Sequence, residues 1–197
     1  MSVTGVVLAA GGSSRLGSPK QLLAYRGAPL LSATLDTARR SGLDRVLVAL
    51  GGAADQVVAQ VDLTGVEVVR NPDFGTGCGS SIRTAIAEVD PATDGIVLLL
   101  GDQPGVSTAA VRRLVDAAGR APIGICRYDD GLGHPFWFAR GMFAELAALH
   151  GDKAVWKLLH SGRYEVVEVP VAGPVPIDVD TLDDYRALLA ADAGGDR

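Results

Sequence analysis

Several short apolar runs in this sequence show no alternation of polar and apolar residues. The clearest are Val6-Val7-Leu8, Val46-Leu47-Val48 and Ile96-Val97-Leu98-Leu99-Leu100. A strand that is buried on one face alternates, whereas a strand covered on both faces is apolar throughout, as in parallel sheets. These runs therefore predict a sheet that carries helices on both of its faces.

Helical patterns alternate with short strand patterns along the chain. We predict strands at Gly5–Ala9, Val46–Leu50, Val66–Val69, Ile96–Leu100, Ile123–Arg127, Pro135–Phe138 and Val166–Val169. We predict helices at Pro29–Ser41, Ala54–Val61, Ser80–Val89, Ser107–Ala118, Met142–Leu149, Lys153–Ser161 and Thr181–Ala191, with Ser107 and Thr181 as N-caps. Such alternation is typical of α/β proteins. The predicted fold is a three-layer α/β/α arrangement around a mostly parallel, mixed central sheet.

Length and charge limit the domain organisation and the class of partner. The chain has 197 residues and a net charge of −5. No linker pattern interrupts it, so we expect one domain over residues 1–192 and a frayed tail at 193–197. An acidic chain is unsuited to an extended nucleic-acid surface. No apolar run approaches the ~20 residues of a membrane span, and the two cysteines suit a reducing compartment, so we expect a soluble cytoplasmic protein.

The segment after the first predicted strand has the composition of a phosphate-binding loop. Small residues fill positions 9–14 and expose backbone N–H groups that a phosphate chain can approach closely. Arg15 and Lys20 add two positive charges, and Lys20 is one of only three lysines among 18 basic residues. The spacing excludes a Walker A motif, because the lysine comes three residues after Gly17 with no Ser or Thr behind it. A glycine-rich turn with surface charges remains the alternative.

A second glycine-rich segment follows the predicted strand at Val66–Val69. Gly75, Gly77 and Gly79 alternate there, which allows a ligand to approach the backbone, and Ser80-Ser81 can cap the next helix. A capped helix start favours an anion or the edge of a base. A plain turn with an N-cap remains the alternative.

Carboxylates occur at the end of one predicted strand and in an extended segment near the C-terminus. Asp102 follows the strand Ile96–Leu100, which puts it at the binding crevice of an α/β sheet. Burying a lone carboxylate is costly, and Mg²⁺ is the economical partner when a triphosphate is near. Asp178 and Asp180 lie on the same side of an extended segment. A turn or helix-capping aspartate at 102, and a polar strand end at 178–180, remain the alternatives.

Residues 8–20, LAAGGSSRLGSPK, resemble the LAAGxSxRMGxxK signature of nucleotidyltransferases that activate phosphorylated small molecules. They are most similar to the molybdenum cofactor cytidylyltransferase branch, with Leu16 in place of the usual Met. Similar segments follow in the family's order: NP…G…SS from Asn71, GDQP from Gly101, GHP from Gly133, and DVDTLDDY from Asp178 for the family's DIDTPEDL. Gly151-Asp152 matches the start of a GD-x-GAR element, but Lys153-Ala154-Val155-Trp156 departs from it. The acceptor side is thus matched less well than the nucleotide side.

The resemblance implies a nucleotide-diphospho-sugar transferase-like fold and a role for each matching residue. It assigns nucleotide binding to Leu8, Ala9, Ala10, Gly11, Gly12, Ser13, Arg15, Lys20, Asn71, Gly77 and Ser81, catalysis to Arg15, Lys20 and Asp102, magnesium binding to Asp102 and Asp180, and acceptor binding to Gln103, His134 and Asp178. Asp178 faces either the substrate or a second ion. His134 either bonds the acceptor or orders its loop. We expect Trp137 and Trp156 in the core.

The function implied by the resemblance is magnesium-dependent transfer of CMP from CTP to a molybdopterin-type molybdenum cofactor, with release of pyrophosphate. A molybdenum hydroxylase or its maturation factor would be the protein partner. Guanylyl or other nucleotidyl transfer to a different phosphorylated small molecule is one alternative. A nucleotide- or cofactor-binding protein that delivers its cargo without turnover is another, although such a protein could lose the metal carboxylates.

Overall fold

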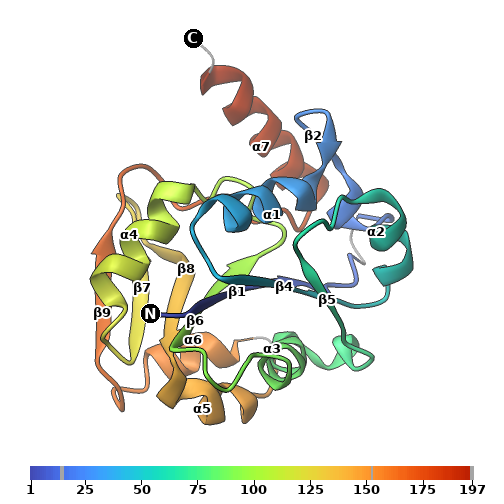
Figure 1. Ribbon diagram of the computed structural model, residues 1–197. Helices are drawn as coiled ribbons and strands as arrows, with labels where there is room; N and C mark the ends of the chain where they lie inside the picture. The colour runs from blue at the N-terminus through green and yellow to red at the C-terminus, as the bar shows by residue number, and fades with distance from the viewer. Residues whose placement is uncertain (14–15, 152, 196–197) are drawn as a thin grey trace.

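The central sheet organises the molecule (Figure 1). In the computed structural model, residues 1–13, 16–151 and 153–195 are described. Seven strands pair in the order β5-β4-β1-β6-β8-β7-β9. Their bounds are β1 Val3–Ala9, β4 Arg45–Leu50, β5 Glu67–Arg70, β6 Gly95–Leu100, β7 Ile123–Arg127, β8 Leu132–Ala139 and β9 Val166–Pro170. A separate hairpin pairs β2 (Ala24–Tyr25) with β3 (Ala28–Pro29).

The sheet is mostly parallel and mixed, as predicted. β1 lies between β4 and β6 and is parallel to both, and β5 extends this half in parallel. β8 runs antiparallel between β6 and β7, and β9 pairs in parallel with β7. The carboxyl ends of β1, β4, β5 and β6 therefore meet at one edge of the sheet, where ligands bind in folds of this kind.

Helices cover both faces of the sheet, with α3, α5 and α6 below it in Figure 1 and α1, α2 and α4 above it. The bounds are α1 Leu30–Arg40, α2 Ala54–Gln60, α3 Cys78–Ala87, α4 Thr108–Ala118, α5 Phe143–Ala147, α6 Ala154–Leu159 and α7 Leu182–Gly195. Three short 3₁₀ turns, η1 Lys20–Leu22, η2 Phe74–Thr76 and η3 Arg140–Met142, complete the described elements.

The two apolar cores explain the non-alternating runs. Successive strand residues point to opposite faces. Val7 and Val48 enter one core with α1, α2 and α4, while Val6 and Leu47 enter the other with α3, α5 and α6. Both faces of the central strands are covered, so the runs at 6–8, 46–48 and 96–100 are apolar at every position.

Predicted helix caps are confirmed at two helices and wrong at a third. The Ser107 hydroxyl accepts from the N–H of Ala110 at 3.1 Å and starts α4. Thr181 and Asp184 bond reciprocally, since the Asp184 carboxylate accepts from the Thr181 N–H at 2.8 Å and the Thr181 hydroxyl accepts from the Asp184 N–H at 3.2 Å. By contrast, α3 begins at Cys78, ahead of Ser80-Ser81.

The early start of α3 has a local cause. Gly77 has a φ of 104°, a left-handed value that turns the chain straight into the helix. The Ser80 hydroxyl lies inside the first turn and donates to the carbonyls of Gly77 (2.8 Å) and Asp73 (3.0 Å) instead of capping.

The last helix is longer than predicted. α7 runs to Gly195 rather than ending at Ala191. Asp192 is bound by the Arg26 guanidinium and by the Tyr25 hydroxyl at 3.2 Å, and these contacts tie the end of α7 to the β2–β3 hairpin. Partners that lie about 166 positions away in the sequence give no local signal.

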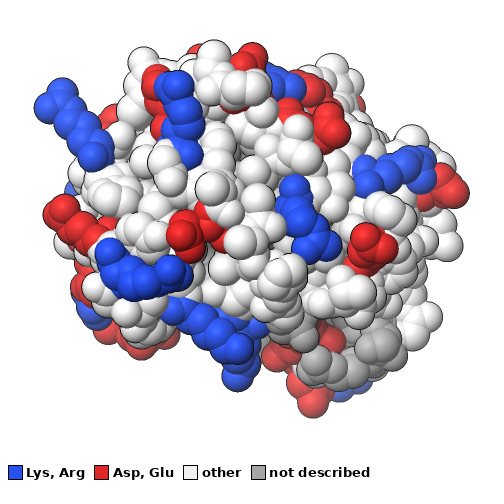
Figure 2. All heavy atoms as spheres, turned by 90° about the horizontal axis from the view of Figure 1, so that it is seen from below, with Lys and Arg blue, Asp and Glu red and all other residues white. Residues whose placement is uncertain are grey.

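Charge is dispersed over the face that carries α3, α5 and α6. Figure 2 shows this face from below, with basic and acidic side chains intermingled. Among the described residues, no helix is both long enough and apolar enough to cross a membrane.

Candidate functional site

A cavity of about 1010 Å³ opens at the carboxyl ends of the parallel strands. Its walls come from the loop after β1, the η2–α3 loop, the end of β6, strand β8, helix α6 and the segment before α7. The predicted site residues that line it are Leu8, Ala9, Ala10, Gly11, Gly12, Ser13, Lys20, Gly77, Ser81, Asp102, Gln103, His134, Asp178 and Asp180. Segments separated by most of the chain thus converge on one space.

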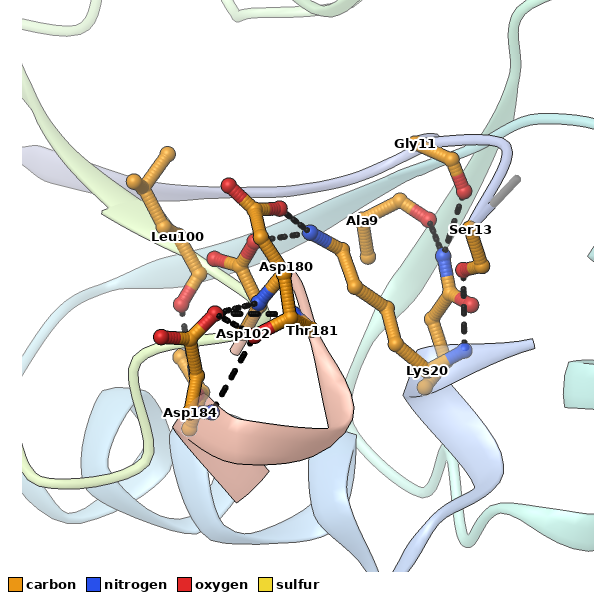
Figure 3. Close-up of polar contacts among 11 residues, drawn as sticks. Ala9, Gly11, Ser13, Lys20, Leu100, Asp102, Asp180, Thr181 and Asp184 are labelled. Carbon is orange, nitrogen blue, oxygen red and sulfur yellow. Dashed lines mark hydrogen bonds and ion pairs between the residues drawn. The ribbon is translucent and has the colours of Figure 1, made fainter. Parts of the chain in front are cut away.

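The loop after β1 is closed by a hydrogen bond between its two ends. The Ser13 hydroxyl accepts from the backbone N–H of Lys20 at 2.9 Å (Figure 3). Ser13 itself adopts a positive φ of 50°. This closure brings Lys20 back beside the glycines, although it comes several residues later in the chain. Arg15, which the resemblance assigns to nucleotide binding and catalysis, lies outside the residues that the structure describes.

Lys20 forms the charged centre of the cavity. Its ammonium reaches between two carboxylates, in contact with Asp102 and at 2.8 Å from Asp180 (Figure 3). The lysine and Asp102 side chains are 13% and 17% exposed, so water screens this pair weakly. Burial lowers the pKa of the lysine, but the Asp102 and Asp180 carboxylates outweigh burial and raise it above its ordinary value. Lys20 is therefore a fixed positive charge at neutral pH.

One backbone contact brings the distant carboxylates together. The N–H of Val179 donates to the carbonyl of Asp102 at 3.1 Å and fastens the segment before α7 to the end of β6. Val179 is fully buried, so its neighbours Asp178 and Asp180 both face the cavity. The predicted placement of these two side chains on one side is confirmed.

Asp178 and Gln103 also line this cavity, with Gln103 buried and the Asp178 side chain more open to solvent. Burial, and then repulsion by Asp102 and Asp180, raise the pKa of Asp178 to about 6. Gln103 is buried and donates to the carbonyl of Pro176 at 3.1 Å. Three carboxylates therefore face one lysine, and this imbalance favours binding of a further cation.

The described residues do not form a complete metal cage. No group of three His, Cys, Asp or Glu side chains among them could hold a metal ion by itself. Two carboxylates nevertheless fit Mg²⁺, because that ion usually takes one or two protein carboxylates and completes its shell with water and substrate phosphates. The donor chemistry at Asp102 and Asp180 is therefore suitable for a divalent cation that arrives with a nucleotide.

Asn71 occupies a different place from the one predicted. Its side chain is 2% exposed and does not line the cavity. Its amide donates to the hydroxyls of Ser80 and Ser81, both at 2.9 Å, while its oxygen accepts from the N–H of Asp73 at 2.9 Å. The amide is thus saturated within the protein, and Asn71 positions Ser81 on the cavity wall instead of contacting a ligand itself.

The loop after β4 supports the cavity, although we did not predict it to take part. A Cβ atom on Gly51 would lie 2.4 Å from the carbonyl oxygen of Ala10 and 2.7 Å from the Phe74 ring. Gly52 packs against the same ring, which lines the cavity. The signal in the sequence was the glycine pair directly behind a buried strand.

Aromatic side chains from β8 and α6 form a further wall of the cavity, the aromatic wall. The imidazole of His134 stacks on Phe136 with 3.9 Å between ring centroids, where the ladder between β7 and β8 shifts register. Burial lowers the pKa of His134 to about 3, so this imidazole is neutral. Trp137 is in the core as predicted, but Trp156 is half-buried and lines the cavity, edge-on to Phe136 at 5.4 Å.

Family membership follows from comparison with known proteins. A model of the MobA-like NTP transferase domain matches residues 5–167. The chain belongs to this family. Its members are nucleotidyltransferases, and the expected three-layer fold with a nucleotide-diphospho-sugar transferase-like architecture is confirmed.

Relatives of this MobA-like protein include solved structures. Rv0371c from Mycobacterium tuberculosis H37Rv is 56% identical with a TM-score of 0.92, over 96% of this chain and 98% of that one. A complex of Rv0371c with manganese is 54% identical with a TM-score of 0.89, over 97% of this chain and 100% of that one.

Two curated relatives carry different names. Nicotine blue oxidoreductase from Paenarthrobacter nicotinovorans is 32% identical over 197 residues, which is 95% of this chain and 96% of that protein. The bifunctional protein GlmU from Burkholderia mallei is 40% identical over 134 residues, which is 66% of this chain and only 29% of GlmU.

Proposed function

We propose that this MobA-like protein transfers CMP from CTP to a molybdopterin-type molybdenum cofactor, depends on magnesium, and releases pyrophosphate. The observation that carries the proposal is the position of Lys20, between Asp102 and Asp180 and beside the glycine loop. A triphosphate on that loop would bring its phosphates next to one fixed cation and two carboxylates. This is the charge arrangement that phosphoryl-group chemistry requires.

Asp102 and Asp180 are the residues that would hold the metal. The Lys20 ammonium lies between them and contacts both. When bound, a divalent cation supplies positive charge to the phosphate oxygens. The manganese complex of Rv0371c, at 54% identity, supports metal binding by proteins of this kind.

The reaction needs positioning more than acid–base chemistry. An oxygen of the acceptor's phosphate would bond to the α-phosphorus while the bond from that phosphorus to the oxygen leading to the β-phosphate breaks. The acceptor oxygen is already anionic near neutral pH, so no strong base is required. Lys20 would neutralise charge on the transferred group and on the leaving pyrophosphate. Arg15 is proposed to assist it.

The acceptor is proposed to lie between the charged centre and the aromatic wall. His134 and Trp156 line that side, and the neutral imidazole of His134 can donate or accept one hydrogen bond without adding charge. Gln103 and Asp178 line the same cavity, and they are proposed to contact the phosphorylated acceptor beside the nucleotide. A half-buried indole beside buried aromatic rings suits a flat heterocycle such as a pterin.

The decisive experiment follows pyrophosphate release. The purified protein is incubated with Mg²⁺ or Mn²⁺, each of the four nucleoside triphosphates, and molybdenum cofactor. Release with CTP, together with a cytosine dinucleotide product, would support the proposal. The variant Asp102→Asn should lose turnover yet keep its thermal unfolding temperature; near-normal turnover in that variant would contradict the proposed role of Asp102.

The other outcomes point to other functions. Preference for GTP over CTP would indicate guanylyl transfer. Turnover only with sugar phosphates would show that the acceptor is a sugar phosphate and not molybdopterin. Binding of nucleotide without pyrophosphate release would support a delivery protein. Nicotine blue oxidoreductase is similar over 95% of this chain. Oxidation of NADH or NADPH with a dye as electron acceptor, without pyrophosphate release, would therefore favour a redox enzyme.

A further inference from the structure

Gln21 is a buried amide whose contacts the proposed reaction does not explain. It lies in η1, directly after Lys20, and is 3% exposed. Its Nε2 donates to the carbonyl of Ala9 at 2.7 Å and to that of Gly11 at 3.2 Å. Its Oε1 has no hydrogen-bond donor within the described part of the chain.

The chemistry fixes which way this amide faces. Both protons of the NH₂ group are used, one on each loop carbonyl. A flipped amide would set Oε1 against two carbonyl oxygens, which repel it. The side chain therefore offers the loop two donors, at the expense of an acceptor left without a partner among the described residues.

Holding two carbonyls also orients the neighbouring N–H groups. In a planar trans peptide, the C=O of one residue and the N–H of the next point in opposite directions. With the carbonyls of Ala9 and Gly11 held by Gln21, the N–H groups of Ala10 and Gly12 point away from it. Neither N–H donates to an acceptor in residues 1–13, 16–151 or 153–195.

We propose that Gln21 is a positioning residue that sets the loop amides of Ala10 and Gly12 to receive the triphosphate. This inference rests on the proposed nucleotide-binding function and adds a residue to it. Gln21 does not touch the reacting atoms. It acts by fixing peptide planes, so that the loop need not reorganise when an anion with several phosphates arrives.

Direct binding separates this role from a general loss of structure. Gln21→Met keeps the length of the side chain without its donors, and Gln21→Glu replaces them with acceptors. Affinity for CTP and for inorganic tripolyphosphate should both fall about 10-fold in Gln21→Met, and further in Gln21→Glu, because loop amides hold charged oxygens. Affinity for cytidine should stay near that of the wild type.

Ser41→Ala is the control for the loss of a buried donor. The Ser41 hydroxyl is buried and donates to the carbonyl of Thr37 at 2.6 Å, but Ser41 does not line the cavity. Its substitution should leave tripolyphosphate affinity unchanged. In turnover assays, Gln21→Met should raise the KM for the nucleotide more than it lowers kcat.

The outcomes distinguish failure of the inference from failure of the function. If the wild type binds no triphosphate, the proposed function fails. If it binds but Gln21→Met binds equally well, or loses cytidine and tripolyphosphate alike, the positioning role is overturned. If the variants do not fold, amide NMR of the wild type decides: tripolyphosphate should shift the Ala10 and Gly12 resonances, and the absence of these shifts would overturn the proposal.

Discussion

The buried histidine of the aromatic wall should make the protein sensitive to acid. Burial lowers the pKa of His134 from 6.5 to about 3. Between pH 6.5 and about pH 3, this histidine is therefore protonated in the unfolded chain but neutral in the folded protein. The stability that this histidine contributes is complete above pH 6.5 and is lost progressively as the pH falls. At pH 4 the loss amounts to about 3 kcal/mol, and it changes little if the folded pKa is a unit higher or lower.

The perturbation is His134→Phe, which keeps a ring stacked on Phe136 and removes the proton site. The free energy of unfolding in urea is measured for both proteins between pH 7 and pH 4. The wild type should lose about 3 kcal/mol more than the variant over this range, whatever their difference at pH 7. His150→Phe, at an exposed histidine, is the control. If wild type and His134→Phe lose stability in parallel, the reasoning from burial is refuted.

Three further predictions follow from the contacts around the cavity and from burial in the core. Gly51→Ala places a Cβ 2.4 Å from the carbonyl oxygen of Ala10. The free energy of unfolding in urea should fall by about 1–3 kcal/mol, and nucleotide binding measured by titration should weaken. Unchanged stability would show that the loop accommodates the methyl group without cost. Asn71→Ala removes the donors to Ser80 and Ser81 and should cost about 2 kcal/mol in urea unfolding, and a neutral result would exclude its supporting role. Burial raises the pKa of the Cys126 thiol to about 12, so mass spectrometry should find no alkylation there by iodoacetamide at pH 8 until the protein is unfolded, whereas rapid native labelling would contradict that burial.

The layers of the fold were predictable because they depend on local periodicity. Strands that are apolar at every position can only be covered on both faces, and Val6 and Val7 do enter opposite cores. The Ser107 cap was predictable for the same reason, since its partner lies three residues away. Where the physics is local, a sequence pattern is sufficient.

The sequence predictions were wrong where a residue distant in the chain, or a backbone angle, determines the local structure. Ser80-Ser81 has the composition of a cap, but the left-handed φ of Gly77 starts the helix earlier. Asn71 stands in a ligand-like motif, yet its amide is saturated by its own neighbours. Half-burial of Trp156 depends on where α6 meets the cavity, which composition does not reveal.

Many of the residues proposed for the site line one cavity, but their contacts with one another could not be predicted. Asp102 and Asp180 were paired through the family resemblance, which assigns both of them to one magnesium ion. Only the folded structure shows that Lys20 lies between them and that the Gln21 amide donates to the loop carbonyls. The contacts of Lys20 join segments that are far apart in the sequence.

The hydrogen bond from the Val179 N–H to the Asp102 carbonyl has a consequence for biosynthesis. The charged centre takes one carboxylate from residue 180, beyond the stretch 5–167 that matches the family domain. A nascent chain can thus complete its central sheet while still lacking half of its carboxylate pair. The charged centre is assembled last, once the segment before α7 has left the ribosome and docked. A prematurely terminated chain that retains the sheet would therefore lack both this wall of the cavity and the carboxylate pair.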